Sequence, residues 1–135
     1  MFERCLFFNV NALARRVNKI WEQAFHEFEL SPAHAYLVRL VLDQPGISQK
    51  QVVDELRLEK STVTRFVDAL EARQLLRRER QGRDVLVFPT RGSKALQAKL
   101  EKTGDALFQT MLSTLGNKEM QELVSKLRQA YDKLA

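Results

Sequence analysis

Four neighbouring residues of this 135-residue sequence carry hydroxyl or guanidinium groups: Ser61, Thr62, Thr64 and Arg65. Apolar residues interleaved with them recur at helical spacing and predict a helix with one buried face: Val63, Phe66, Val67 and Leu70. The polar groups therefore lie at the start of the helix, on or beside its exposed face. Hydroxyl and guanidinium groups in this position can bind phosphate oxygens and the base edges of a major groove.

A basic segment follows this helix. Residues 73–83 contain five arginines and a single glutamate, and the arginines are Arg73, Arg77, Arg78, Arg80 and Arg83. Gly82 separates two strand-compatible runs, residues 75–80 and 85–88, which predicts a hairpin with a turn over residues 81–84. Charge runs are most often only solvated surface. Charge at a hairpin tip beside an exposed helix instead favours contact with nucleic acid.

The segment before residue 61 predicts a companion helix. Ser48 is followed three residues later by Gln51, the spacing of a capping box at a helix N-terminus. A turn over residues 57–60 then leads into the helix that carries Arg65. A short hairpin is only marginally stable alone and must pack on the helices before it. Residues 47–90 are therefore predicted to form a helix-turn-helix with a hairpin wing.

This segment resembles the winged helix-turn-helix of the MarR family of bacterial transcription regulators. The resemblance rests on matching stretches of sequence at residues 47–49, 60–65, 70–73 and 89–92. It extends over nearly the whole chain, because the helices predicted before and after the wing also fit. It implies a mainly α fold with a β wing: a winged helix-turn-helix with long N- and C-terminal dimerisation helices.

Three features depart from the family's pattern. Val53 stands where a small residue is usual, and Arg57 stands where the turn usually has glycine. A non-glycine residue with positive φ costs on the order of 1 kcal/mol, so a reshaped turn is expected at Arg57. The wing is also shorter than usual, with Arg83 near its tip.

Long helices are predicted on both sides of the winged segment. Ser31 and Pro32 form a helix start, and Thr90 is expected to cap a fifth helix. Gly116 ends that helix, and Asn117 is expected to cap a sixth. The expected organisation is a single domain over residues 1–135, with dimerisation helices at 3–29 and 91–134 and the DNA-reading segment at 31–90.

The apolar surface of these helices exceeds what one short chain can cover. The simplest solution is a two-fold homodimer in which the first, fifth and sixth helices of two chains interleave. The alternative is a compact monomeric helical bundle. A dimer would present two recognition helices to successive major grooves, about 34 Å apart, and would bind a pseudo-palindrome.

Double-stranded DNA is the expected partner. Arg65 is the candidate for bidentate contact with a guanine, and its alternative role is an ion pair with Asp68 or Glu71. Gln49 and Lys60 are expected to hold phosphates, and Ser48 either binds DNA or serves only as a cap. The wing contributes a minor-groove or phosphate contact. The full set is Ser48, Gln49, Lys60, Ser61, Thr62, Thr64, Arg65, Arg80 and Arg83.

The resemblance also implies a signal. Family members commonly lose DNA affinity on binding small, often aromatic acids, or on oxidation of a cysteine. The candidate residues for an effector cleft are Trp21, His34, Tyr36 and Arg39, each of which also fits an ordinary core or surface role. Cys5 beside Arg4 is the redox candidate. Its alternative is a buried, inert thiol.

Other classes of protein fit less well. With two histidines, one cysteine and no Gly-rich phosphate loop, no catalytic set is recognisable, so neither an enzyme nor a cofactor or metal site is predicted. No segment resembles a signal peptide or membrane span. The lone cysteine suits a reducing cytoplasm. The resemblance implies a bacterial protein associated with the nucleoid. A winged helix that docks protein is the remaining alternative, although residues 47–95 hold +4 of the net charge of +5.

Overall fold

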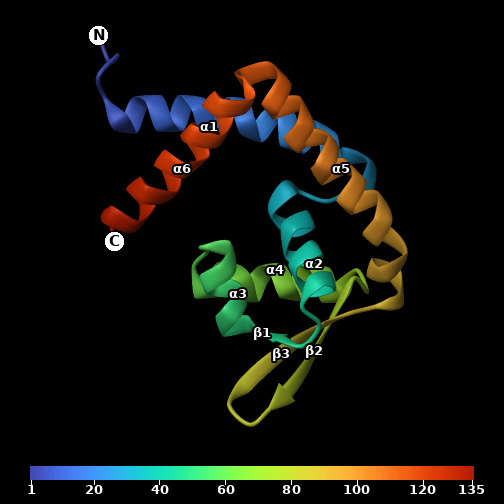
Figure 1. Ribbon diagram of the computed structural model, residues 1–135. Coiled ribbons are helices and arrows are strands. Elements are labelled where there is room, and N and C mark those ends of the chain that lie inside the picture. Colours follow the sequence, from blue (N-terminus) through green and yellow to red (C-terminus); the bar gives the residue numbers. More distant parts are fainter. The chain divides into compact units, whose positions relative to one another are not determined.

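The computed structural model describes residues 1–135 as two compact units, residues 1–101 and residues 102–135. The first unit contains α1 (Leu6–Phe25), η1 (His26–Phe28), α2 (Pro32–Asp43), β1 (Ile47–Ser48), α3 (Gln49–Leu56), α4 (Lys60–Ala72), β2 (Leu76–Gln81) and β3 (Asp84–Pro89). The long helix α5 (Arg91–Leu115) begins in the first unit, and α6 (Asn117–Lys133) belongs to the second (Figure 1). This mainly helical chain with one small sheet confirms the predicted fold class. The single domain over residues 1–135 stays a prediction.

The first helix is shorter than predicted. Cys5 has an extended backbone (φ −82°, ψ 117°), so α1 begins only at Leu6. At the other end the chain tightens into the 3-10 turn η1, and Glu29 ends it in a left-handed conformation with φ 54°. The start of α2 is as predicted, because the Ser31 Oγ accepts a hydrogen bond from the His34 N–H at 3.1 Å. No helix in the structure combines the length and the apolar run that crossing a membrane requires.

The helix-turn-helix is formed by α3 and α4. The capping box is confirmed: Ser48 Oγ accepts from the Gln51 N–H at 3.1 Å, and Gln51 Oε1 accepts from the Ser48 N–H at 3.1 Å. Arg57 ends α3 in the left-handed conformation that glycine adopts without cost (φ 55°), so the reshaped turn expected at this residue is not observed. The recognition helix α4 starts at Lys60, one residue earlier than expected.

The wing is the hairpin of β2 and β3. The sheet has the order β1-β3-β2, with all pairs antiparallel, so β2 is an edge strand. Gln81 pairs with Asp84, which leaves Gly82 and Arg83 as a two-residue loop, tighter than predicted. Gly82 has φ 64°, which suits the first position of a type II′ turn. The hairpin extends beyond α3 and α4 (Figure 1), and the pairing of Gln81 with Asp84 places Arg83 at its tip.

Buried side chains fix the wing and the helices of the first unit to one another. Fully buried residues come from α1, α2, α3, α4, both wing strands and the first part of α5: Phe25, Ala35, Leu37, Val38, Val41, Val52, Val63, Val67, Leu70, Leu76, Val87, Ser93 and Leu100. Three of the four residues predicted to form the buried face of α4 are among them, whereas Phe66 is only half-buried. The elements predicted to bind DNA therefore share one core.

The capping residue predicted for α5 is confirmed, whereas the one predicted for α6 is not. Thr90 caps α5 as predicted, because its Oγ1 accepts from the Ser93 N–H at 3.2 Å while Ser93 Oγ accepts from the Thr90 N–H at 2.9 Å. The prediction of Asn117 as the cap of α6 is wrong. Gly116 holds that position with φ 97°, and its carbonyl accepts the Met120 N–H at 2.9 Å. Glycine reaches this positive φ without steric cost.

Candidate nucleic-acid interface

The start of α4 presents polar groups to solvent. Ser61 and Arg65 are exposed, and Thr62 and Thr64 are half-buried. The Thr64 hydroxyl donates to the carbonyl of Lys60 at 3.1 Å, and Arg65 Nη2 donates to Thr62 Oγ1 at 3.4 Å. Glu59, Lys60, Ser61, Thr64 and Arg65 line one shallow hollow. These short-range contacts orient the side chains and leave Arg65 without a carboxylate partner.

The alternative role of Arg65 is not observed. Asp68 and Glu71 lie three and six residues after Arg65 on α4. Both bind Arg78 of β2 instead of Arg65. The guanidinium of Arg65 keeps most of its donors free. A planar group with free parallel donors is suited to a guanine edge or a phosphate.

A second hollow, of about 520 Å³, lies between the start of α3, the start of α4 and the wing tip. Its lining includes Ser48, Gln49, Lys60 and Arg83, four of the residues predicted to bind DNA. The positive end of the α3 dipole and three cationic side chains, Lys50, Lys60 and Arg83, meet there with two acidic ones, Asp54 and Asp84. Gln49 Oε1 is buried without a hydrogen-bond partner. The cations and the N–H groups at the start of α3 can bind a backbone phosphate here, whereas Gln49 Oε1 is an acceptor and cannot.

The five arginines of residues 73–83 have different environments. Arg73 donates to the carbonyls of Glu29 at 2.6 Å and Phe28 at 3.4 Å, so it joins α4 to the end of η1. Arg77 binds Glu79 at 3.2 Å and lies over the Phe88 ring, 4.4 Å from its centroid. These two arginines have structural roles that the charge count did not reveal.

Two wing arginines, Arg80 and Arg83, are predicted to bind DNA. Arg80 and Arg83 are exposed and form no ion pair in the structure. Arg80 lies on the strand and Arg83 in the two-residue loop. Their guanidinium groups therefore remain available to DNA.

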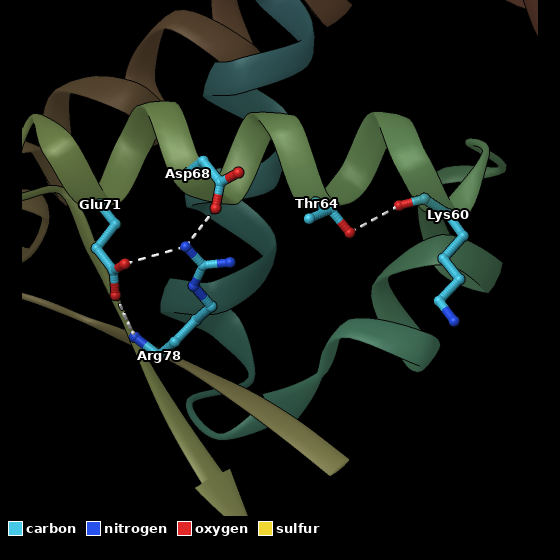
Figure 2. A network of polar contacts seen from close by, with 5 residues as sticks. All are labelled: Lys60, Thr64, Asp68, Glu71 and Arg78. Carbon is cyan, nitrogen blue, oxygen red and sulfur yellow. Dashed lines mark hydrogen bonds and ion pairs between the residues drawn. The ribbon is translucent and has the colours of Figure 1, made fainter. Parts of the chain in front are cut away.

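Arg78 forms a cluster with two acids of α4 that sequence reasoning missed (Figure 2). Its Nη2 contacts Asp68 Oδ1 and lies 3.1 Å from Glu71 Oε1, and its backbone N–H donates to Glu71 Oε2 at 2.9 Å. The pKa of Glu71 lies below its ordinary value because the Arg78 backbone N–H, and then its guanidinium, stabilise the carboxylate. We call Asp68, Glu71 and Arg78 the Arg78 cluster.

The lowered pKa of Glu71 predicts a pH dependence of stability. Because the folded-state pKa is below the ordinary value of 4.5, the stabilisation is complete above about pH 4.5 and is lost as pH falls through the folded pKa. Urea unfolding should show that Glu71→Gln is less stable than the wild type near pH 7, and that the gap narrows in acid. Glu55→Gln, an exposed acid of α3 without an ion pair, is the control. A gap independent of pH would contradict this assignment.

Two of the effector candidates, Trp21 and Tyr36, lie together. Trp21 Nε1 donates to Tyr36 Oη at 3.0 Å. Both line an apolar groove of about 250 Å³ with Val17, Asn18, Pro32, Ala33, Leu56 and Leu58. Arg39 lies 5.4 Å from the centroid of the Tyr36 ring and lines an adjoining hollow that Tyr36 and Leu56 also share.

His34 does not line this groove, and its place in an effector cleft stays a prediction. Its ring packs edge-on against Phe66 of α4, with centroids 4.5 Å apart. Burial, and then the charge of Arg73, lower the pKa of His34. His34 therefore joins α2 to the recognition helix. A histidine on α2 could not be assigned to either side from the sequence, because both sides of that helix carry apolar neighbours.

Cys5 lies half-buried at the cap position before α1. Its carbonyl accepts from Asn9 Nδ2 at 2.8 Å, and the backbone of Asn9 donates to the same oxygen at 3.1 Å. These contacts hold the backbone and do not involve the sulfur. A redox role for Cys5 stays a prediction.

A helix-turn-helix followed by a β hairpin with free basic side chains defines a winged helix-turn-helix protein. Residues 28–84 match the model of the MarR family. A curated relative, the HTH-type transcriptional regulator MgrA of Staphylococcus aureus, is 26% identical over 132 residues, which cover 94% of this chain and 90% of the relative. The chain is therefore similar to the MarR family over residues 28–84, and along nearly its whole length it is similar to a transcriptional regulator.

Solved structures show the same fold. MepR of S. aureus, solved in complex with DNA, superposes with a TM-score of 0.85 at 18% identity, covering 98% of this chain and 100% of that one. BpsR of Bordetella bronchiseptica superposes with a TM-score of 0.87 at 24% identity, covering 98% of this chain and 96% of that one. The winged fold therefore extends along nearly the full length of both neighbours.

Proposed function

We propose that this protein is a transcriptional regulator that binds a pseudo-palindromic operator in double-stranded DNA as a homodimer and represses transcription. The main support is the convergence of Lys60 and Arg83 on one hollow, with exposed Arg65 nearby on α4 and exposed Arg80 on the wing. These cations come from separate elements and have no acidic partner. MepR, which shares this fold, has been solved bound to DNA.

Unpaired apolar surface supports the homodimer. None of the 17 residues of α6 is buried, although the helix has exposed apolar residues at Leu123, Val124, Leu127 and Tyr131. The helix α1 likewise leaves Leu6, Phe7, Phe8, Val10, Leu13 and Ile20 exposed. Amphipathic helices with uncovered apolar faces require a partner. A second copy of the chain supplies matching helices with two-fold symmetry.

A small aromatic effector is the proposed signal. The groove beside Trp21 and Tyr36 is apolar and adjoins Arg39, a combination that suits an aromatic molecule with a polar or anionic group. DNA binding by the fold neighbour BpsR is regulated by 6-hydroxynicotinic acid. Oxidation of Cys5 is the alternative switch. It would be favoured if peroxide released DNA from the wild type but not from Cys5→Ser.

Salt dependence tests DNA binding against protein docking. If about 6–10 phosphates are contacted, affinity for duplex DNA should fall by roughly 10³–10⁵ between 50 and 200 mM salt. Fluorescence anisotropy with labelled duplexes measures this slope. A winged helix that docks only protein would show weak, shallow binding. Selection of genomic fragments by the purified protein then tests specificity, and recovery of no palindromic site would contradict an operator-binding role.

A further inference from the structure

The wing is attached to the recognition helix through Arg78. Both carboxylate oxygens of Glu71 accept from this one residue: Oε2 from its backbone N–H at 2.9 Å and Oε1 from its Nη2 at 3.1 Å. Asp68, one turn earlier on α4, contacts the same Nη2. The backbone of β2 takes part in these bonds through the Arg78 N–H. They therefore fix the position of β2 along the axis of α4 as well as its distance from the helix.

This attachment occurs at the free edge of the sheet. In the order β1-β3-β2, the outer N–H groups of β2 have no strand to pair with, and Glu71 satisfies one of them. Side chains two residues apart on a strand leave the same face. Arg80 therefore leaves β2 on the same face as Arg78. The position of Arg80 relative to α4 thus depends on the contact that Arg78 makes.

The Arg78 cluster also neutralises two carboxylates of α4. Figure 2 shows Lys60, Thr64, Asp68 and Glu71 on one side of the helix, with Arg78 meeting the two acids from the strand. Lys60 and Thr64 belong to the end that is proposed to bind DNA. Two unpaired carboxylates farther along this side would repel phosphates. Arg78 pairs with both of them.

We propose that Arg78 is a positioning residue for DNA recognition, holding the wing at one position along α4 so that Arg80, Arg83 and the start of α4 contact one DNA site together. The inference rests on the proposed DNA binding. It differs from a role in charge neutralisation alone, which would need no fixed geometry. It also differs from support of the fold alone, which would affect stability without altering sequence preference.

A distance measurement without DNA tests the geometric part. Spin labels are placed at Ser61→Cys on α4 and Gln81→Cys on the wing, both exposed, in a Cys5→Ser background diluted with unlabelled protein. Pulsed electron paramagnetic resonance should give a narrow distance distribution for this background and a broad one for Arg78→Gln. Arg78→Lys should be intermediate, because a lysine offers a point charge instead of a fork. The matched control is Arg77→Gln, which removes the same charge from the same strand. An unchanged distribution in Arg78→Gln overturns the proposal even if DNA binding is intact.

A binding measurement tests the functional part. The ratio of affinities for a selected palindrome and for nonspecific duplex should fall about tenfold in Arg78→Gln, the order of one lost base-edge contact, and stay unchanged in Arg77→Gln. The triple variant Asp68→Asn/Glu71→Gln/Arg78→Gln has no carboxylates left to neutralise and should remain defective. If the triple variant regained the wild-type affinity ratio, neutralising the two carboxylates would be the whole role of Arg78. The positioning role would then be overturned. If thermal unfolding shows that Arg78→Gln does not fold, Arg78→Lys serves for the same comparison, with a smaller loss expected.

Discussion

Aspartate at both Leu123 and Leu127 of α6 is expected to convert the protein to a monomer and to weaken operator binding by about 10²–10⁴-fold. Both leucines are exposed in the single chain, at 37% and 46%, so the substitutions remove no packing from an isolated subunit. In a dimer they would place charges in an apolar interface, where burying an unpaired charge is costly. A monomer also loses the gain in affinity from linking two half-site contacts.

Analytical ultracentrifugation and operator titration measure the two effects. The matched control is Ser125→Asp/Gln129→Asp, which adds the same charges at the same spacing on the other side of α6, where the native side chains are polar. This control should remain dimeric. If the Leu123→Asp/Leu127→Asp variant also remained a dimer with unchanged affinity, the α6 face would not be the interface.

The features predicted correctly from sequence are governed by near neighbours. The capping box of Ser48 and Gln51, the cap at Ser31 and the glycine at the wing turn each depend on residues within a few positions. Local hydrogen bonding and allowed φ determine such features, so sequence spacing reveals them. Asn117 is the exception, because Gly116 was equally able to cap and also provided the positive φ that the turn required.

The features that were missed depend on contacts distant in sequence. The five arginines of residues 73–83 look equivalent in the sequence. In the fold, however, Arg73 donates to the carbonyl of Glu29, 44 residues away, and Arg78 binds the helix that precedes its strand. Only the fold brings these partners together. The two arginines that remain free, Arg80 and Arg83, could be selected from the sequence only through the resemblance to a family. His34 shows the same limit, since its neighbour Phe66 is more than 30 positions away.

Alanine at Arg65 and alanine at Lys60 are expected to affect DNA binding in different ways. Arg65 is exposed, has no carboxylate partner and lies at the proposed groove-facing end of α4. Arg65→Ala should lose about 1–3 kcal/mol of discrimination and relax the preference at one operator position. Lys60 lines the hollow beside Arg83. Lys60→Ala should weaken binding to every sequence alike and reduce the magnitude of the salt slope by about one phosphate contact.

Competition of operator variants against nonspecific duplex, repeated at several salt concentrations, separates the two effects. Lys99→Ala, which removes an exposed charge from α5, is the control and should change neither quantity. If Arg65→Ala left both affinity and preference intact, α4 would not read the major groove through this residue. If instead both variants only lowered the salt slope, Arg65 would be a phosphate contact. Sequence discrimination would then have to come from the hydroxyls of Ser61, Thr62 and Thr64 or from the wing, since these are the remaining groups able to reach base edges.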